Sequence, residues 1–323
     1  MDLRSVALGL LAFLVMVAVW PAFPDLAVAP RWAVVSIGAS LVLVCSRPRH
    51  LSVPLAALAV IGWAALSLLW TPVLWDGLHE IAKLLSLGLV LLLAYEVRDH
   101  RPAVFGAAAG AAVSGLLALM QVRGYAGFPQ IDVPGGLFGN KNIMGETMAL
   151  VVILILAEAL ESRRLWWPTL ALAIPVCAGL LASGARAAQA AVMAAVVLAI
   201  WRWRKGAGVI AIAVAALVAA AVMLQPGATA TLVDRGRIWA ATATGIEWGG
   251  HGIGSFYSTF PSLPGAVDGG AERADHAHND FLEIAFELGP IAASAAAAAA
   301  ALAIFGGGPF GLVIAAIAVE GCF

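Results

Sequence analysis

Long apolar segments separated by short polar connections make up most of this 323-residue chain. A helix needs about 20 apolar residues to cross the hydrocarbon core of a membrane, and shorter segments are tolerated at some cost. The strands of a membrane barrel would instead alternate apolar and polar residues over shorter segments. The pattern therefore predicts an all-α, polytopic transmembrane bundle of about ten or eleven spans. The expected spans are residues 5–22, 32–46, 51–70, 79–96, 102–121, 143–160, 166–183, 187–201, 207–224, 290–305 and 309–323, the last of which is too short to cross comfortably.

The same pattern divides the chain into three regions. Residues 1–224 form an N-terminal bundle of about nine spans, residues 225–289 form one long polar loop, and residues 290–323 form C-terminal spans. We expect short helices and the chemically active side chains in the long loop, because polar residues are concentrated there. The first apolar run resembles a signal peptide, but we expect it to be retained as a span because Pro30 directly follows the cleavage-like Ala27-Val28-Ala29.

The composition supports a membrane protein. Hydrophobic residues make up 62% of the chain and charged residues 11%, with a mean hydropathy of +0.96, whereas soluble domains carry about 25% charged residues. A net charge of −1 argues against a nucleic-acid partner. Cys45, Cys177 and Cys322 lie far apart in apolar runs without metal-site spacing, so we expect them to act as small hydrophobic side chains.

The positions of the basic residues predict an orientation, because Lys and Arg are enriched in the cytoplasmic connections of membrane proteins. With a cytoplasmic N-terminus, the inner side holds Arg4, Arg47, Arg49, Arg98, Arg101, Arg163, Arg164, Arg202, Arg204 and Lys205. The segments 122–142, 183–187 and 225–289 then all face the non-cytoplasmic side. We expect these three segments to contribute to one site.

The most polar stretch, residues 275–289 (DHAHNDFLEIAFELG), predicts a short amphipathic helix with a histidine at its beginning. Asn279 or Asp280 is the expected N-cap, and Gly289 is expected to end the helix. His278 would then lie at the helix N-terminus, where the positive end of the helix dipole disfavours protonation. A neutral imidazole at that position is suited to act as a general base.

Two other interpretations of this stretch remain open. Asp275, His276, His278 and Asp280 are all competent metal ligands, but a zinc site normally needs three or four protein ligands and the next histidine, His251, is distant in sequence. We therefore expect no metal. The histidines can also simply cap a helix or lie at the headgroup boundary of the membrane.

Three arginines are candidates for holding an anionic group. Arg186 stands in a short turn that is expected on the outer side, and Arg235 and Arg237 lie two residues apart at the start of the long loop. Guanidinium groups bind phosphates in a bidentate manner, which suits a diphosphate near a membrane. The alternatives are an interfacial anchor for Arg186, and a headgroup contact or an ion pair with Asp234 for the other two.

Further polar residues stand in or near the outer connections. Asn140 and Asn142 are candidate N-caps for the following span, and Lys141 is placed either to reach the interface or to meet an anion. Lys83 follows Glu80 by three residues, so an ion pair within the helix is as plausible as a functional role. A glycine-rich segment, Gly249 to Gly254, either lets a ligand approach the backbone or forms turns.

Four motifs, taken together and in order, resemble the O-antigen ligase and O-antigen polymerase superfamily of bacterial membrane glycan transferases. The motifs are LFGNKN (Leu137 to Asn142), SGAR (Ser183 to Arg186), DRGRIW followed by GGHGIGSF (Asp234 to Phe256), and HAHNDFLEIAFELG (His276 to Gly289). The last motif, with its His278-Asn279 pair and Gly289, is the most specific. The sequence departs from the family pattern in two places. Ala292 stands where the family often has glycine, and the chain ends at Phe323 inside an apolar run, so we expect a truncated C-terminus.

The resemblance implies a helical bundle similar to the GT-C class in the bacterial inner membrane, and metal-independent glycosyl transfer without a cofactor. The implied donor is a glycan on polyprenyl (undecaprenyl) diphosphate, and the acceptor is lipid A-core or another glycan. His278 would activate the acceptor hydroxyl at the periplasmic face, while Arg235 and Arg186 would hold the diphosphate. Residues predicted to contact the substrate are Arg237, Asn279, Asn140, Lys141, Asn142, His276 and Lys83.

The resemblance leaves ligase and polymerase as open alternatives, because they share the donor chemistry and differ in the acceptor. Two other classes are a transporter of lipid-linked glycans and a zinc-dependent membrane hydrolase. A transporter would need polar residues near mid-membrane, of which the predicted spans contain few. The hydrolase would need a ligand set such as HExxH, which the sequence lacks.

Overall fold

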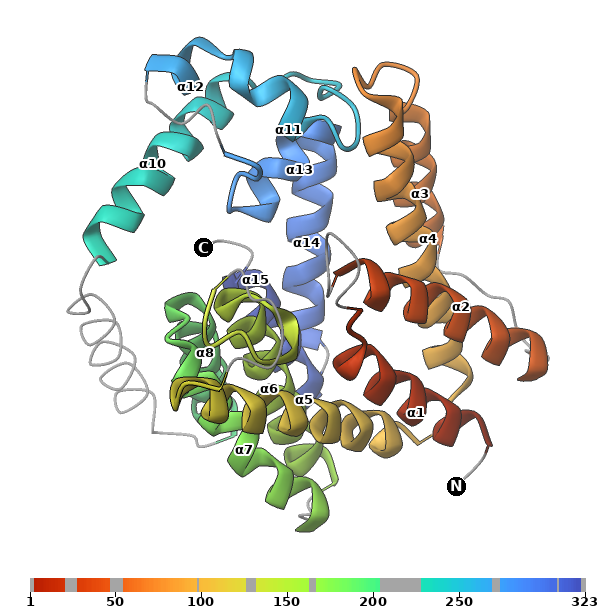
Figure 1. The fold of residues 1–323 in the computed structure, drawn as a ribbon. Helices are drawn as coiled ribbons and strands as arrows, with labels where there is room; N and C mark the ends of the chain where they lie inside the picture. Colours follow the sequence, from red (N-terminus) through yellow and green to blue (C-terminus); the bar gives the residue numbers. More distant parts are fainter. Residues whose placement is uncertain are drawn as a thin grey trace. The chain divides into compact units, whose positions relative to one another are not determined.

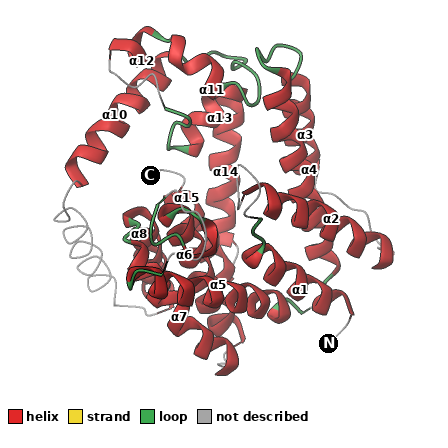
Figure 2. Ribbon diagram, viewed as in Figure 1, coloured by secondary structure: helices red, strands yellow, loops and turns green. Residues whose placement is uncertain are grey.

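The structure of the protein, a computed structural model, describes most of the chain as helices joined by short loops (Figures 1 and 2). The described residues are 3–20, 28–46, 55–97, 99–125, 132–162, 167–203, 228–268, 274–306 and 308–320. Within these ranges the structure contains no strand, which confirms the predicted all-α fold class.

The helices follow the predicted spans closely. They are α1 Leu3–Val17, α2 Val28–Ser46, α3 Leu55–Ser67, α4 Leu74–Glu96, α5 Arg101–Val122, α6 Lys141–Ser162, α7 Trp167–Ser183, α8 Arg186–Trp203, α10 Ala228–Thr244, α11 Phe256–Thr259, α12 Pro264–Asp268, α13 Asp280–Leu288, α14 Pro290–Gly306 and α15 Gly311–Glu320. Short 3-10 turns, η1 Gly136–Phe138, η2 Phe260–Ser262 and η3 Gly308–Phe310, join some of them. The predicted span 207–224 lies outside the described residues. Helix α4 begins at Leu74, before the predicted start at residue 79.

Among the described residues, three helices are long and apolar enough to cross a membrane: Leu74–Ala94, Arg101–Val122 and Lys141–Glu161. Shorter apolar helices accompany them, among them Leu3–Val17, Trp167–Ser183 and Pro290–Gly306. The apolar runs in the sequence include residues that end up in the connections, so several helices are shorter than the runs predicted. The total of ten or eleven spans therefore stays a prediction.

The chain folds as two compact units, the first of which comprises Met1–Ser52, Ser86–Ala216 and Ile304–Glu320. Helix α5 is its centre and packs against α1, α6 and α7. Small residues on α5 make this possible, since small side chains let helix backbones approach closely. A Cβ atom at Gly106 of α5 would overlap the backbone of Gly9 in α1.

The second unit comprises Val53–Leu85, Leu217–Ala303 and Gly321–Phe323. Its core contains the rings of Phe256, Phe260 and Phe286, each almost completely buried. Phe256 stacks on Phe260 with ring centroids 4.7 Å apart and meets Phe286 edge-on at 5.3 Å. The described part of the predicted long loop, residues 228–268 and 274–289, is therefore largely helical and packs around an apolar core of its own.

Candidate active site

The predicted helix in the most polar stretch is present as α13, and its ends are those expected from the sequence. Asn279 is the N-cap: its side-chain oxygen accepts a hydrogen bond from the backbone N–H of Leu282 at 3.1 Å. The helix ends at Gly289, whose φ of 87° lies in a region that L side chains rarely adopt. A capped helix of nine residues thus begins directly after His278.

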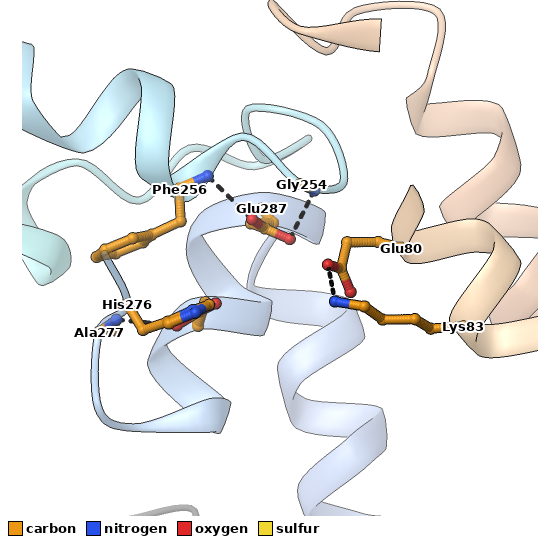
Figure 3. A network of polar contacts seen from close by, with 8 residues as sticks. Glu80, Lys83, Gly254, Phe256, His276, Ala277 and Glu287 are labelled. Atoms are coloured by element: carbon orange, nitrogen blue, oxygen red, sulfur yellow. Dashed lines mark hydrogen bonds and ion pairs between the residues drawn. The ribbon is translucent and has the colours of Figure 1, made fainter. Parts of the chain in front are cut away.

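Glu283 of α13 holds the loop in front of the helix. One carboxylate oxygen accepts a hydrogen bond from the backbone N–H of Ala277 at 2.8 Å, and the other lies 3.0 Å from Nδ1 of His276 (Figure 3). The carbonyl oxygen of Ala277 in turn accepts a hydrogen bond from Nε1 of Trp239 in α10 at 3.0 Å. Both backbone groups of the buried Ala277 are therefore bonded, one to each of two helices.

His278 has an unusual backbone conformation between these anchors. Its φ is 52°, the one positive φ of a non-glycine residue in the described chain. Such a conformation costs on the order of 1–3 kcal/mol and persists where the surroundings enforce it. Here Ala277 on one side and the N-cap Asn279 on the other enforce it, so the direction of the His278 side chain is set by the fold.

The two histidines of this loop have opposite electrostatic environments. Partial desolvation lowers the pKa of His278 below its ordinary value, and the positive charges of Arg235 and His276 add to the effect. The hydrogen bond that His276 makes to the carboxylate of Glu283 raises the pKa of His276 instead. Pairs of titratable groups whose pKa values are driven apart are typical of acid and base roles. His278 is thus the histidine suited to accept a proton.

Arg235 and Arg237 lie on α10 but in different surroundings. Arg235 precedes Trp239 by four residues, so both project from the same face of α10, and Trp239 bonds to Ala277 beside His278. The positive charge of Arg235 is one of the causes that lower the pKa of His278. Arg237 is exposed and lies 3.7 Å from the carboxylate of Asp234, the ion pair that was the alternative interpretation.

Arg186 and the motif at Leu137 to Asn142 belong to the first compact unit. Arg186 begins α8, after a turn in which Gly184 has a φ of 64°. Asn140 caps α6, since its side-chain oxygen accepts from the N–H of Asn142 at 2.8 Å. Asn142 itself lies inside α6, so its predicted N-cap role is wrong. Lys141 forms a 3.0 Å ion pair with Asp132, and thus meets an anion supplied by the protein.

Lys83 of α4 forms the ion pair with Glu80 that the sequence suggested as one alternative (Figure 3). In Figure 3 this pair points toward the last turn of α13, where Glu287 lies. The carboxylate of Glu80 contributes to the electrostatic environment of both Glu287 and His276. Lys83 is therefore paired with Glu80, and both side chains face the end of α13 that carries Glu287.

Glu287 is a half-buried residue that the sequence did not single out. Its two carboxylate oxygens accept hydrogen bonds from the N–H groups of Gly254 and Phe256, each at 2.9 Å (Figure 3). Its own carbonyl oxygen accepts from the N–H of Gly252 at 2.8 Å. The sequence contains one feature that could have singled out Glu287: it lies in the last turn of the predicted helix. A carboxylate there is electrostatically disfavoured and needs other partners.

The glycine-rich segment packs the backbone against the protein itself. Gly250, Gly252 and Gly254 have φ values of 65°, 95° and 71°. A Cβ at Gly250 would overlap the backbone of Glu287, and one at Gly252 would overlap Thr71. One interpretation of the sequence was that these glycines let a ligand approach the backbone. In the structure, the groups that approach them belong to other parts of the same chain.

The potential metal ligands of the loop do not form a cluster. In the described residues, no three His, Cys, Asp or Glu side chains come together in a way that could hold an ion. His276 instead bonds to Glu283, and Asp280 lies in the first turn of α13. The expectation that the site works without a metal stays a prediction.

The fold and the site together define a helical membrane protein with a conformationally fixed histidine of lowered pKa in a polar segment. Residues 170–297 match a family model described as O-Antigen ligase. The match covers less than half of the chain, and it shows that residues 170–297 are similar to the O-antigen ligase family, in agreement with the resemblance of the motifs. The match includes the motifs around Arg186, Arg235 and His278. No curated protein matches the chain.

The burial of Glu287 predicts a measurable pH dependence of stability. Desolvation raises the pKa of Glu287 from 4.5 to about 7, although the bonds from Phe256 and Gly254 act in the opposite direction. Because folding raises this pKa, the contribution to stability is fully present below about pH 4.5 and is lost as the pH rises through about 7, on the order of 3 kcal/mol in total. In detergent, the melting temperature of Glu287→Gln should fall less between pH 5 and pH 8 than that of the wild type.

Glu247→Gln is the matched control for this measurement, because the side chain of Glu247 is exposed. That variant should keep the pH dependence of the wild type. An unchanged pH dependence in Glu287→Gln would show that the half-buried carboxylate does not titrate in this range.

Proposed function

We propose that the protein transfers a glycan from a polyprenyl-diphosphate donor to an acceptor hydroxyl, with His278 as the general base. The observation that carries this proposal is the environment of His278, which combines an enforced backbone conformation with a lowered pKa beside Arg235. The family match supports a glycan as the group transferred. The distribution of basic residues supports a site on the periplasmic side of a bacterial inner membrane.

In the proposed step, the neutral imidazole of His278 takes the proton of the acceptor hydroxyl. The hydroxyl oxygen attacks the anomeric carbon of the donor sugar as the bond from that carbon to the diphosphate oxygen breaks. Polyprenyl diphosphate leaves with the electron pair, the configuration at the anomeric carbon inverts, and the imidazolium passes its proton to solvent. A base whose pKa lies near or below neutral pH is largely unprotonated and ready for this task.

Arg235 is proposed to bind the diphosphate. Negative charge increases on the leaving diphosphate during the transfer, and a guanidinium placed to meet it stabilises the transition state. Its place on the face of α10 that contacts the His278 loop supports this role. Arg186 has the same role by family resemblance, and it stays a prediction. Arg237 is the weaker candidate because it already faces Asp234.

No metal or cofactor is required by this step, since the arginines supply the positive charge and the histidine supplies the base. A ligase and a polymerase carry out the same step and differ in the acceptor, lipid A-core for the first and a glycan for the second. Purified protein offered each acceptor, with and without chelator, distinguishes these alternatives by the product formed.

The variant His278→Ala tests the proposed function. We expect it to lower the rate of glycan transfer from a polyprenyl-diphosphate donor by about 100-fold or more, since general-base catalysis contributes about 10²- to 10⁴-fold. The rate is measured with purified protein and normalised to the amount of folded protein. His100→Ala, which changes an exposed histidine of the first unit, should transfer at the wild-type rate. Wild-type transfer by His278→Ala would exclude His278 as the base.

The pH dependence of transfer gives an independent test. Protonated His278 cannot accept the acceptor proton, so kcat/KM should fall as the pH falls through the pKa of His278. Because that pKa is lowered, the fall should occur below pH 6.5. His276→Gln removes one of the positive charges that lower it and should move the fall to higher pH. A wild-type profile that falls above pH 6.5 would contradict a neutral His278.

A further inference from the structure

The second compact unit contains an open groove lined with tryptophans. Its volume is about 890 Å³, within the range of about 300–1,000 Å³ that is usual for ligand sites. Trp63 comes from α3, Trp70 from the turn before α4, and Trp248 from the turn after α10. The aromatic lining therefore comes from segments that are far apart in the sequence.

The tryptophan rings are positioned before any ligand binds. Nε1 of Trp63 donates a hydrogen bond to the carbonyl oxygen of Leu288 at 2.9 Å. The rings of Trp63 and Trp70 meet edge to face with centroids 5.8 Å apart. The turn that carries Trp248 is closed by a hydrogen bond from the N–H of Gly250 to the carbonyl oxygen of Glu247 at 3.1 Å.

The rings remain accessible in spite of these contacts. Trp63 is 40% exposed, Trp70 39% and Trp248 81%. Gly249 and Gly250 line the groove without side chains that would fill it. The groove thus offers flat aromatic faces around an open space.

The charges of the lining restrict what can bind. Glu247 is the one ionisable side chain among the described lining residues, and it is exposed. Because the described lining contains no Lys, Arg or His, this carboxylate would repel phosphate groups, whether of a diphosphate or of a lipid headgroup. It would also be costly to bury against an acyl chain. The same carboxylate readily accepts hydrogen bonds from hydroxyl groups. Hydroxyl-bearing, uncharged rings are the ligands that satisfy both conditions.

We propose that this groove is a subsite for neutral sugar units of the donor glycan, whose apolar C–H faces would pack on the indole rings. The proposal rests on the proposed glycan transfer. The groove lies at the C-terminal end of α13, where Leu288 and Pro290 contact or line it, whereas His278 precedes the N-terminal end. The helix has nine residues, so at 1.5 Å per residue the two places are separated by roughly 13 Å.

This separation determines which sugars of the donor can bind in the groove. The sugar that reacts must lie at His278, and the groove can take only sugars further along the glycan. A donor with a chain of several sugars would reach it, whereas a donor with a single sugar would not. The groove should therefore favour transfer of long glycans over short ones.

The test compares donors that carry a single sugar (the short donor) with donors that carry a chain of repeats (the long donor) on the same polyprenyl diphosphate. Trp248→Ala should lower kcat/KM for the long donor by about three- to tenfold, as expected for the loss of one aromatic stacking partner, and leave the short donor unchanged. Trp248→Phe should restore most of the preference. Trp75→Ala is the matched control, because Trp75 is 78% exposed and lies outside the groove.

Equal effects of Trp248→Ala on both donors, or no effect on either, would overturn the subsite while leaving the transfer function intact. Quenching of Trp248 fluorescence by phospholipids with brominated acyl chains would also overturn it, because the groove would then hold lipid. Failure of the wild type with both donors would refute the transfer function instead. In that case binding is measured with the long glycan alone, released from its lipid. It should shift the tryptophan fluorescence of the wild type and not that of Trp248→Ala, and the absence of this shift would overturn the subsite.

Discussion

The carboxylates of Glu283 and Glu287 bind backbone N–H groups that lie outside the regular helices. Glu283 accepts from Ala277, and Glu287 accepts from Gly254 and Phe256. The two residues are four apart on α13 and therefore lie on one face of the helix. A buried backbone N–H without a partner costs about 1–3 kcal/mol, so these contacts decide which loop conformations are stable. Helix α13 thereby organises the loop before it and the glycine-rich segment beside it.

The consequences for chemistry follow from the first of these contacts. Glu283 and Trp239 fix Ala277 from opposite sides, and Asn279 caps the helix. His278 lies between them and takes a strained backbone conformation that the neighbours stabilise. In the proposed mechanism, this strain would be small compared with the benefit of a base that needs no rearrangement when substrate binds, because positioning of reacting groups accounts for a large part of enzymatic rate enhancement. Glu283 also binds His276 and raises its pKa, whereas the pKa of His278 is lowered.

Local features of the site were predictable from the sequence, and contacts between distant segments were not. The bounds of α13, its Asn279 cap and its end at Gly289 follow from residues within one short stretch. The partners of Glu287 lie more than 30 residues away, and the Trp63 bond to Leu288 joins residues 225 apart. No spacing rule reveals such pairs. The tryptophan groove is therefore visible only in the folded chain, since its rings come from separate elements.

We propose that Glu283 acts by positioning His278, and the most direct measurement of this role is steady-state glycan transfer by Glu283→Gln and Glu283→Ala. Glutamine can still accept from the N–H of Ala277 and can donate to His276, whereas alanine can do neither. We predict that Glu283→Gln keeps most of the wild-type kcat. Glu283→Ala should lose about tenfold or more in kcat with little change in the KM for the donor, because only an interaction needed in the transition state is removed. Equal kcat values for the two variants, or wild-type transfer by Glu283→Ala, would contradict the account.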